Sequence, residues 1–309
     1  MSPNKYAPIA LFVYKRPDHL AKTIYSLKQN FLSNKSKLII FSDSYKDDKD
    51  YKKVKLVRKI IKEVSGFNKV EIVERKNNFG LSRNILDGIN DVISVYKRII
   101  VLEEDLVTSP FFLSYINQGL NIYKDNPKVA SIHGYCYPIK FQKKMIEDTF
   151  FLKGADCWGW GTWKESWDKF VNDPNILVNN ILKKKLVKKF NFDDSFSYFQ
   201  MLINNSKKLN DSWAIRWYAS AFLNNMYTLY PRISLVKNIG NDGSGYHFNS
   251  TNNKKDIFKT DFFTDYKKFK KIKIEQNIYA YNMFKNFFID NFKKSFVRNI
   301  LDKLKAYNY

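Results

Sequence analysis

The sequence predicts an α/β fold in which helices flank a mostly parallel sheet. Apolar segments of about four to eight residues alternate four times with segments whose apolar residues recur at helical spacing. The apolar segments are nearly continuous, as in strands that are covered on both faces. With 309 residues, of which 44% are hydrophobic, the chain can build a large core.

The four predicted strands lie in the first third of the chain. They cover, in order, residues 7–14, 37–41, 70–73 and 99–102. Pro17 and Asp18 suit the first turn of a helix after the first strand. Apolar residues recur at helical spacing in the three intervening segments, namely Leu20, Ile24 and Leu27; Val54, Val57, Ile61 and Val64; and Leu81, Ile85, Ile89, Val92 and Tyr96.

The second half of the chain is less regular. Its pattern predicts, in order, a helix from Ser109, a strand over residues 129–132, a solvated helix with five lysines over residues 182–190, a helix opening within residues 210–217, and a strand over residues 227–236.

Three carboxylates, Glu103, Glu104 and Asp105, follow the fourth strand directly. Adjacent anions repel one another, so such a cluster at a strand end is expected where a positive group sits beside it. A hard divalent cation holding a diphosphate fits, because Mg²⁺ and Mn²⁺ take oxygen ligands and bridge carboxylates to phosphates. The alternative is an acidic, solvated loop.

Polar residues also follow the other strands. Arg16, Asp43 and Asn78 come just after the first three strands, as Asp105 does after the fourth. Ligands of such sheets bind beyond the carboxyl ends of the strands, so these side chains are expected on one rim. The sequence has neither the glycine pattern of dinucleotide-binding loops nor that of a P-loop.

Two segments of the second half combine glycine with candidate functional side chains. Residues 154–167 hold four tryptophans and three glycines. This pattern predicts either a core cluster, for at least two of the rings, or a loop whose aromatic faces meet a sugar or diphosphate. Residues 238–247 form a glycine-rich segment that ends in His247, a candidate metal ligand.

The formal net charge is +23, which favours an anionic partner such as nucleic acid, an acidic membrane surface or a phosphorylated substrate. A genome rich in lysine codons is the alternative explanation. Cys136 and Cys157 match neither a disulfide framework nor a metal spacing. No apolar run reaches the length of a membrane span, and the first residues lack a signal peptide. We therefore expect a cytoplasmic location, either free or peripheral at the inner face of the membrane.

The last segment, residues 254–309, has a different composition. It holds 14 Lys and Arg against 6 Asp and Glu, and phenylalanines recur beside the lysines at roughly helical spacing. This pattern is typical of an amphipathic helix at an anionic membrane surface. It is equally typical of a helix packed on its own domain.

Four motifs together give the chain a resemblance to a known family. They are residues 14–20, residues 78–84, the triplet 103–105, and the pair 158–163 and 242–247. In this order, over roughly residues 7–250, the chain resembles the inverting, metal-dependent nucleotide-sugar glycosyltransferases of the GT-A fold. It looks closest to bacterial family-2-like sugar transferases and is more distantly similar to N-acetylglucosaminyltransferase I.

The resemblance implies a Rossmann-like, GT-A type sheet and a division of the chain. Residues 1–135 would be the half that binds the nucleotide sugar. Residues 136–252 would be the acceptor-binding and catalytic half of the same domain, and residues 253–309 a basic, amphipathic helical extension. The resemblance also implies that Arg16 and Asp43 contact the nucleotide.

The resemblance gives further roles on the rim. Asn78 and Arg83 would line the donor pocket, with Glu103 beside them. Glu104 would touch the ribose or, through water, the metal. Glu stands here where the family more often has Asp, which leaves its reach to the metal open.

The metal implied by the resemblance is Mn²⁺ or Mg²⁺. Asp105, the last residue of the acidic triplet, would bind it directly, and His247 would complete the shell around the metal or the phosphates.

The expected function is a metal-dependent, inverting transfer of a sugar from a nucleotide diphosphate, with uridine as the expected base. The acceptor would be a hydroxyl of a surface polysaccharide, a lipopolysaccharide or a lipid-linked glycan. A nucleic-acid-binding protein would explain the charge and the aromatic residues but not the acidic triplet. A sugar nucleotidyltransferase would need a phosphate-binding loop near the N-terminus, which residues 14–16 do not form.

An inverting displacement needs a general base on the face of the sugar opposite the leaving diphosphate. Asp211, just before Trp213 at an expected helix start, is the first candidate, and Asp156 in the tryptophan-rich segment is the second. The alternative is that Asp211 or Ser212 only caps the helix.

Overall fold

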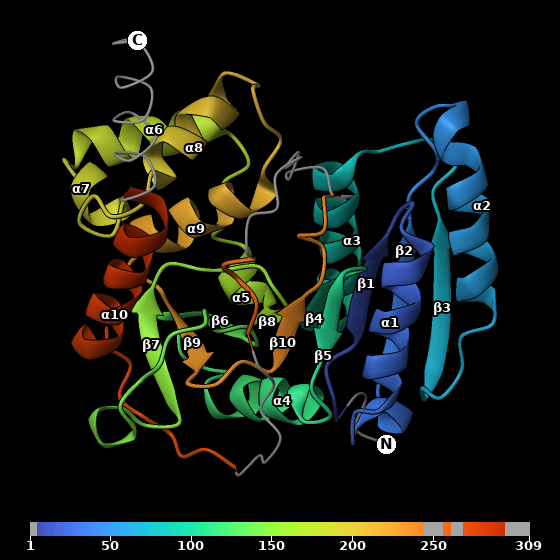
Figure 1. The fold of residues 1–309 in the computed structure, drawn as a ribbon, viewed down its shortest axis with the longest axis horizontal. Helices are drawn as coiled ribbons and strands as arrows, with labels where there is room; N and C mark the ends of the chain where they lie inside the picture. Colours follow the sequence, from blue (N-terminus) through green and yellow to red (C-terminus); the bar gives the residue numbers. More distant parts are fainter. Residues whose placement is uncertain (1–4, 244–255, 261–267, 294–309) are drawn as a thin grey trace, which may run out of the picture.

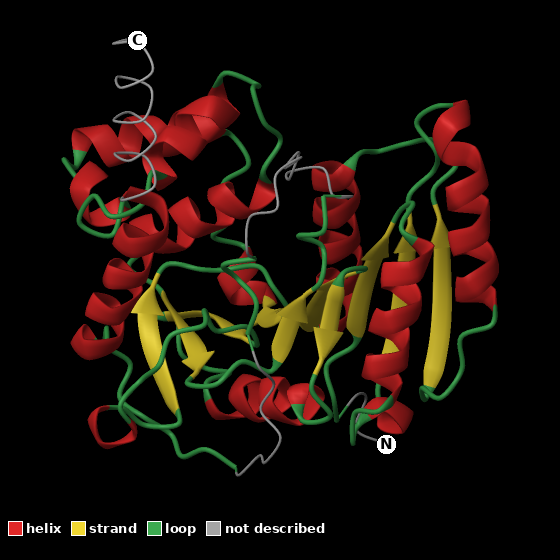
Figure 2. Ribbon diagram, viewed as in Figure 1, coloured by secondary structure: helices red, strands yellow, loops and turns green. Residues whose placement is uncertain are grey.

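The computed structural model describes residues 5–243, 256–260 and 268–293 (Figure 1). An eight-stranded sheet with the order β3-β2-β1-β4-β8-β6-β9-β7 runs through the molecule, and helices cover both of its faces (Figure 2). The predicted α/β class, with a mostly parallel sheet flanked by helices, is confirmed.

The first four strands are parallel to one another, as predicted. They are β1 (Ile9–Val13), β2 (Lys37–Ser42), β3 (Lys69–Glu74) and β4 (Arg98–Glu103). In β1, Leu11 pairs with Ile40 of β2 and with Leu102 of β4. The connecting helices are α1 (Pro17–Lys28), α2 (Asp48–Lys62) and α3 (Leu81–Tyr96), with a short 3-10 helix η1 (Ser33–Lys35).

Alternate residues of the strands face two separate layers of core. Leu11 packs with α1, α2 and the later helix α4 on one face, whereas Phe12 packs with α3 on the other. The Phe12 ring stacks on Phe41 of β2 with ring centroids 5.1 Å apart. The period-two alternation of a strand therefore places one central sheet between two helical layers.

The second half extends the same sheet with strands of mixed direction. Its elements are β5 (Leu106–Thr108), α4 (Phe112–Ile122), β6 (Val129–His133), η2 (Lys143–Met145), β7 (Thr149–Lys153), β8 (Trp160–Trp163), α5 (Lys164–Trp167), α6 (Pro174–Lys183), α7 (Val187–Phe190), α8 (Tyr198–Ser206), α9 (Trp213–Leu223), β9 (Tyr227–Pro231), β10 (Val236–Asn238), α10 (Ile278–Phe288) and the π-helical η3 (Ile289–Lys293). Strand β8 is antiparallel to β4 and β6, β9 is parallel to β6, and β7 is antiparallel to β9. Strands β10 and β5 form a separate antiparallel pair.

The prediction of one strand over residues 227–236 is wrong, because two strands in different sheets share this segment. Pro231 ends β9, since it has no N–H with which to continue a ladder. Ser234 then fixes the turn: its hydroxyl accepts from the N–H of Cys136 and donates to the carbonyl of Val236. Strand β10 consequently starts at Val236 and pairs with β5.

The single solvated helix predicted over residues 182–190 is also two elements. Helix α6 ends at Lys183 and α7 begins at Val187. Lys185, at φ 53°, lies in the left-handed region between them and turns the chain. Phe190 at the end of α7 is fully buried, so this segment also contributes to the core.

The tryptophan-rich segment is mainly core, as one of its two interpretations predicted. Residues 160–163 are strand β8, and three of the four rings, Trp160, Trp163 and Trp167, are buried. Trp160 stacks on Trp213 of α9 with ring centroids 5.8 Å apart. Trp158 is the partly buried ring.

The C-terminal helix α10 packs on its own domain, which was one of the two alternatives. Phe284 and Phe288 are each 1% exposed and lie in the core layer formed with α6, α8 and α9. Phe296 and all other residues after 293 lie outside the described part of the chain. Within the part that the structure does describe, none of the helices combines the length and apolar character needed to cross a membrane.

Replacement of Phe284 by alanine tests this packing. We expect Phe284→Ala to lower the free energy of unfolding by about 3–5 kcal/mol, because a fully buried ring leaves a cavity. The matched control is Ile278→Ala at the start of the same helix, where the side chain is 63% exposed and the change should stay within about 0.5 kcal/mol. Guanidinium unfolding curves measure both, and equal effects would contradict the packing of α10.

Candidate active site

The carboxyl ends of β1, β2, β3 and β4 lie at one edge of the sheet, because the four strands are parallel. Arg16, Asp43 and Asn78 follow the first three strands, and the acidic triplet begins at the last residue of β4. The structure therefore places the predicted rim residues along one edge of the sheet. Within that edge they form two groups, one around Asp105 and one around Asp43.

Glu104 is buried and turned towards the end of β1. Its Oε2 accepts the backbone N–H of Tyr14 at 2.6 Å, and its carbonyl accepts the hydroxyl of Thr23 at 2.8 Å. Burial raises the pKa of the Glu104 carboxyl to about 8. Burial, together with repulsion from Asp105 and Glu104, raises the pKa of Glu103 to about 8 as well. The two glutamates therefore take up protons at neutral pH unless a positive group joins them.

Asp105 carries an ion pair with Arg16. The guanidinium Nη1 of Arg16 donates to Oδ2 of Asp105 at 2.7 Å. Burial raises the pKa of Asp105, and the positive charge of Arg16 opposes that rise. Arg16 is fixed in place because it immediately precedes Pro17, which starts α1.

The segment after β10 closes over this ion pair. Nη2 of Arg16 lies 3.2 Å from the Gly240 carbonyl and 3.2 Å from Oδ1 of Asp242. Nη2 of Arg16 also lies 2.9 Å from Nε2 of His19. Nε2 of His19 in turn lies 3.0 Å from Oδ2 of Asp242. A Cβ on Gly240 would lie 2.1 Å from Oδ2 of Asp105, so only glycine allows this approach.

His19 and Asp242 lie within two of the motifs that carry the resemblance, but neither was predicted to be a site residue. His19 lies three residues after Arg16, a spacing that puts both on one face of a helix start. That spacing is a signal that the sequence contains. Asp242 shows no comparable signal, because its contact with Arg16 joins residues 226 positions apart.

Asp43 organises the second group. Its carboxylate accepts the backbone N–H groups of Phe79 and Gly80 at 2.8 and 2.9 Å, and the side-chain amide of Asn78 at 3.2 Å. Burial raises the pKa of Asp43, and these backbone hydrogen bonds act against the rise. The contacts hold the turn between β3 and α3, where Gly80 has φ 75°. Arg83 points to solvent, with its guanidinium 4.2 Å from the centre of the Phe79 ring.

Asp156 lies beyond the end of β4. Strand β8 is antiparallel to β4, so the residues that precede β8 continue past Glu103. Burial and the charges of Asp156, Glu103 and Asp105 raise the pKa of the Cys157 thiol. The Asp156 carboxylate accepts the N–H of Cys157 at 2.8 Å and lies 3.9 Å from the ring of His133.

Buried and partly buried tyrosines also lie close enough to Asp156 to feel its charge. Burial and the negative charge of Asp156 raise the pKa values of three of them, Tyr137, Tyr198 and Tyr230. These rings belong to the second half of the chain, so Asp156 stands between the acidic triplet and an aromatic wall.

Asp211 stands at the start of α9, where its side chain is 69% exposed. Ser212, not Asp211, caps this helix, because its hydroxyl accepts the N–H of Ile215. The interpretation of Asp211 as the N-cap is therefore wrong. Asp211 lies 3.6 Å from the guanidinium of Arg216.

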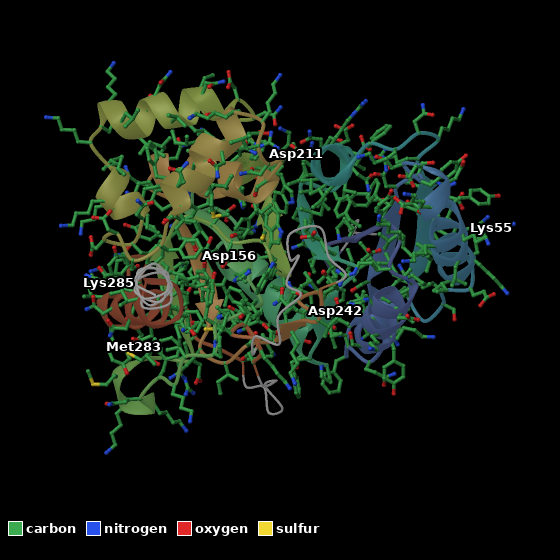
Figure 3. All side chains as sticks on the ribbon, turned by 45° about the horizontal axis from the view of Figure 1, so that its top comes forward. Lys55, Asp156, Asp211, Asp242, Met283 and Lys285 are labelled. Atoms are coloured by element: carbon green, nitrogen blue, oxygen red, sulfur yellow. The ribbon has the colours of Figure 1, made fainter. Side chains whose placement is uncertain are left out.

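Arg216 joins the two halves of the chain at this point. Its buried guanidinium donates to the hydroxyl of Ser82 in α3, to the carbonyl of Asn172 at 3.1 Å and to the carbonyl of Ser212 at 3.3 Å. In Figure 3, Asp211, Asp156 and Asp242 all lie in the middle of the molecule, away from the outer helix that carries Lys55. No role was predicted for Arg216.

The acidic triplet fits a divalent metal ion that takes only one or two ligands from the protein. His247 lies outside the described residues, and among those that are described no three His, Cys, Asp or Glu side chains form a cage for an ion. Mg²⁺ and Mn²⁺ bound to nucleotides commonly take one or two carboxylates, with substrate phosphates and water as the other ligands. The desolvated carboxylates of Glu103 and Asp105 match that donor set.

Part of the structure is similar to solved structures of other proteins. The sequence matches no protein-family model and no curated protein. The structure is similar to the mannosyltransferase PcManGT from Pyrobaculum calidifontis, solved with GDP-Man and Mn²⁺, at a TM-score of 0.35 and 10% identity, over 55% of this chain and 48% of that one. It is also similar to S. aureus TarS at a TM-score of 0.31 and 10% identity, over 46% of this chain and 24% of TarS.

The chain thus spans about half the length of PcManGT and about a quarter of TarS. The function is therefore inferred from the residues of the candidate active site.

The raised pKa values predict how stability depends on pH. An unfolded glutamate titrates near about 4.3, whereas Glu104 in the folded protein titrates at about 8. The folded state binds the extra proton between these values, so stability is greatest below the lower value and falls as pH rises to the upper one. Without ligand, we expect a loss on the order of 1 kcal/mol per pH unit over that window.

Glu104→Gln should reduce this slope without removing it, because glutamine keeps the acceptor for Tyr14 and has no proton to lose, whereas Glu103, whose pKa is also about 8, still titrates. Glu147→Gln, at an exposed position, is the control and should leave the slope unchanged. Unfolding free energies from pH 5 to 8 measure the slopes. A wild-type slope that Glu104→Gln leaves intact would contradict the assignment.

Proposed function

We propose that this protein is a glycosyltransferase of the GT-A type that moves a sugar from a nucleoside diphosphate to an acceptor hydroxyl. The observation that carries the proposal is the set of desolvated carboxylates beside Arg16 at the carboxyl ends of parallel strands. Open α/β sheets bind their ligands at this edge.

In this proposal Asp105 is the direct ligand of Mn²⁺ or Mg²⁺, and the ion neutralises the leaving diphosphate when it is bound. Asp105 must first release Arg16. The freed guanidinium, 2.7 Å from that carboxylate in the structure, is then in reach of the phosphate oxygens. Glu103 is partly exposed whereas Glu104 is buried, so Glu103 is the better placed of the two to touch the donor.

The nucleoside would lie over the second group of rim residues. Asp43 and Asn78 hold the turn before α3 through four contacts in all, which makes a rigid floor beside Arg16. Uridine is the base we propose to test first. Arg83, which lies on the solvent side of Phe79, would reach the donor only at the outer margin of this floor.

The general base in this proposal is Asp211, with Asp156 as the alternative. Asp211 is open to an incoming hydroxyl, and Arg216 connects its helix to Ser82 in the donor half. Such a connection keeps the base at a fixed place relative to the donor, as an aligned displacement requires. The acceptor is proposed to be a glycan or lipid-linked hydroxyl, and an anionic membrane surface is a proposed partner.

Replacement of Asp105 tests the metal site. We expect UDP with Mn²⁺ to raise the melting temperature of the wild-type protein, because a ligand at 100 times its Kd stabilises the native state by about 2.7 kcal/mol. Asp105→Asn should lose the metal-dependent part, and chelator should abolish it in the wild type. Asp125→Asn, with a side chain 85% exposed, is the control and should respond as the wild type does. A full response from Asp105→Asn would remove Asp105 from the site.

Replacement of the two candidate bases tests the chemistry. Asp211→Asn should reduce turnover by about 10²–10⁴-fold. Its UDP–Mn²⁺ thermal shift and its stability should stay near those of the wild type, because Ser212 holds the cap. Sugar release from nucleotide-sugar donors in the presence of an acceptor measures turnover. If Asp211→Asn is active and Asp156→Asn is not, the role of the base moves to Asp156.

A further inference from the structure

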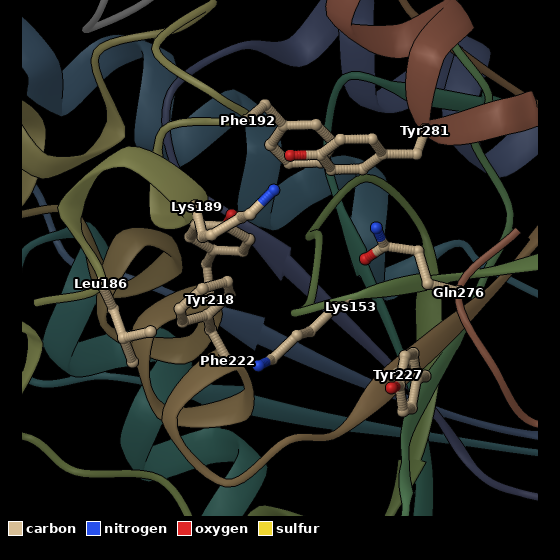
Figure 4. A pocket seen from close by; sticks show the side chains of 9 residues that line it. All are labelled: Lys153, Leu186, Lys189, Phe192, Tyr218, Phe222, Tyr227, Gln276 and Tyr281. Carbon is tan, nitrogen blue, oxygen red and sulfur yellow. The ribbon is translucent and has the colours of Figure 1, made fainter. Parts of the chain in front are cut away.

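A cavity of about 290 Å³ lies apart from the acidic site, between α7, α9, α10 and the ends of β7 and β9 (Figure 4). The residues that define its character are Lys153, Lys189, Phe222, Tyr227, Gln276 and Tyr281. Ligand pockets commonly enclose roughly 300–1,000 Å³. This cavity is at the lower end of that range, which suits a single sugar ring and not a complete nucleotide sugar.

The cavity opens at the opposite end of the strands from the acidic triplet. Strand β9 is parallel to β6, and both β6 and β4 are antiparallel to β8, so β9 runs in the same direction as β4. Tyr227 begins β9, whereas Glu103 ends β4. The cavity is therefore separate from the candidate active site, and it shares no residue with that site.

Aromatic rings line much of the cavity. Phe192 and Tyr281 stack with ring centroids 5.0 Å apart and planes 14° apart, and they close one side in Figure 4. The ring of Tyr227 is partly exposed on the other side. Aromatic faces pack well on the C–H faces of a sugar ring, because both surfaces are flat and weakly polar. The amide of Gln276 faces the same space and offers both a donor and an acceptor to sugar hydroxyls.

Lys153 places a positive charge among these rings. Its Nζ lies 4.4 Å from the centre of the Phe222 ring and donates to the side-chain carbonyl of Asn225 at 2.6 Å. Among the residues that the structure describes, no carboxylate lies within ion-pair distance of Lys153. Burial and the nearby Lys184 lower the pKa of Lys153.

Further lysines strengthen the positive field at this place. Residues 182–190 carry five lysines; Lys189 lines the cavity, and Lys184 is close enough to Lys153 to lower its pKa. Lys189, one of the lining residues, is paired with Asp193 at 2.8 Å. A bound anion would therefore be attracted by Lys153 first and by the surrounding lysines at longer range.

We propose that this cavity binds a hexose that carries one negative charge, as a carboxylate or a phosphate. The sugar ring packs against the partly exposed ring of Tyr227 beside Gln276, and the charged group accepts hydrogen bonds from Lys153. If the proposed function holds, such a sugar is a unit of an anionic acceptor glycan that is anchored away from the transfer site. That last step rests on the proposed function, whereas the binding of the sugar does not.

Titration of the full chain with small sugars tests the inference. The probes are glucuronate, glucose 6-phosphate, glucose and inorganic phosphate, each followed by ligand-detected NMR at fixed ionic strength. We expect at least one charged sugar to bind about tenfold more tightly than both glucose and inorganic phosphate, since a charge-assisted hydrogen bond adds to the ring contacts. The charged sugar that binds more tightly tells whether the carboxylate or the phosphate is the preferred group.

Two lysine variants locate the binding. Lys153→Gln should weaken the preferred charged sugar about tenfold and leave glucose unchanged. Lys55→Gln is the matched control, because Lys55 is an exposed lysine 5.9 Å from the centre of the Tyr51 ring on α2, and it should have no effect. Equal weakening by both variants would show attraction to the basic surface in general and would overturn the proposal.

The wild-type preferences decide the outcome even if Lys153→Gln fails to fold. Failure of both charged sugars to bind more tightly than glucose and inorganic phosphate would overturn the proposal. The UDP–Mn²⁺ thermal shift is measured on the same samples. Sugar binding without that shift would refute the proposed function alone, and the shift without sugar binding would refute this inference alone.

Discussion

The ion pair between Arg16 and Asp105 is the interaction on which the rest of the acidic site depends. Three consecutive carboxylates at the end of a buried strand would repel one another and lose solvation. Two features reduce that cost. The pKa values of Glu103 and Glu104 rise to about 8, which favours their neutral forms at neutral pH. The guanidinium of Arg16 forms an ion pair with Asp105. Without the guanidinium, Asp105 would be left as a poorly solvated anion.

The same ion pair determines the shape of the surrounding chain. Nη2 of Arg16 lies beside the Gly240 carbonyl and Asp242, so the segment after β10 covers the ion pair. Strand β10 can reach this place because it pairs with β5, which directly follows the acidic triplet. A cation or diphosphate that displaced Arg16 from Asp105 would act on the segment 239–242 through these contacts. Binding of such a ligand would thereby be coupled to the position of this segment.

Local sequence patterns predicted the first half of the fold well. Continuous apolar segments marked β1 to β4, and the parallel direction of these strands followed from the helices between them. That direction is sufficient to place Arg16, Asp43, Asn78 and Asp105 on one edge. Their roles stay predictions, because contacts within a rim do not show which ligand it takes.

The second half shows what local patterns leave out. The apolar character of residues 227–236 does not reveal that Pro231 ends one strand and that Val236 begins another in a different sheet. The sequence of the tryptophan-rich segment does not show that β8 inserts between β4 and β6 in the antiparallel direction. That insertion is what brings Asp156 next to the acidic triplet. These features depend on pairings between distant residues, which hydrophobic periodicity does not encode.

The two ends of the sheet differ in charge. A net charge of +23 favours an anionic partner, yet the carboxyl edge of the sheet presents a cluster of carboxylates. The acidic edge by itself attracts a cation, and an anion binds there only together with a cation or with Arg16. The opposite end of the strands has Lys153, half-buried and without a carboxylate beside it in the described structure. An anionic glycan that approached this protein would therefore meet its electrostatic partner at the end of the sheet remote from the acidic triplet, which leaves the carboxylate edge free for a metal-bound diphosphate.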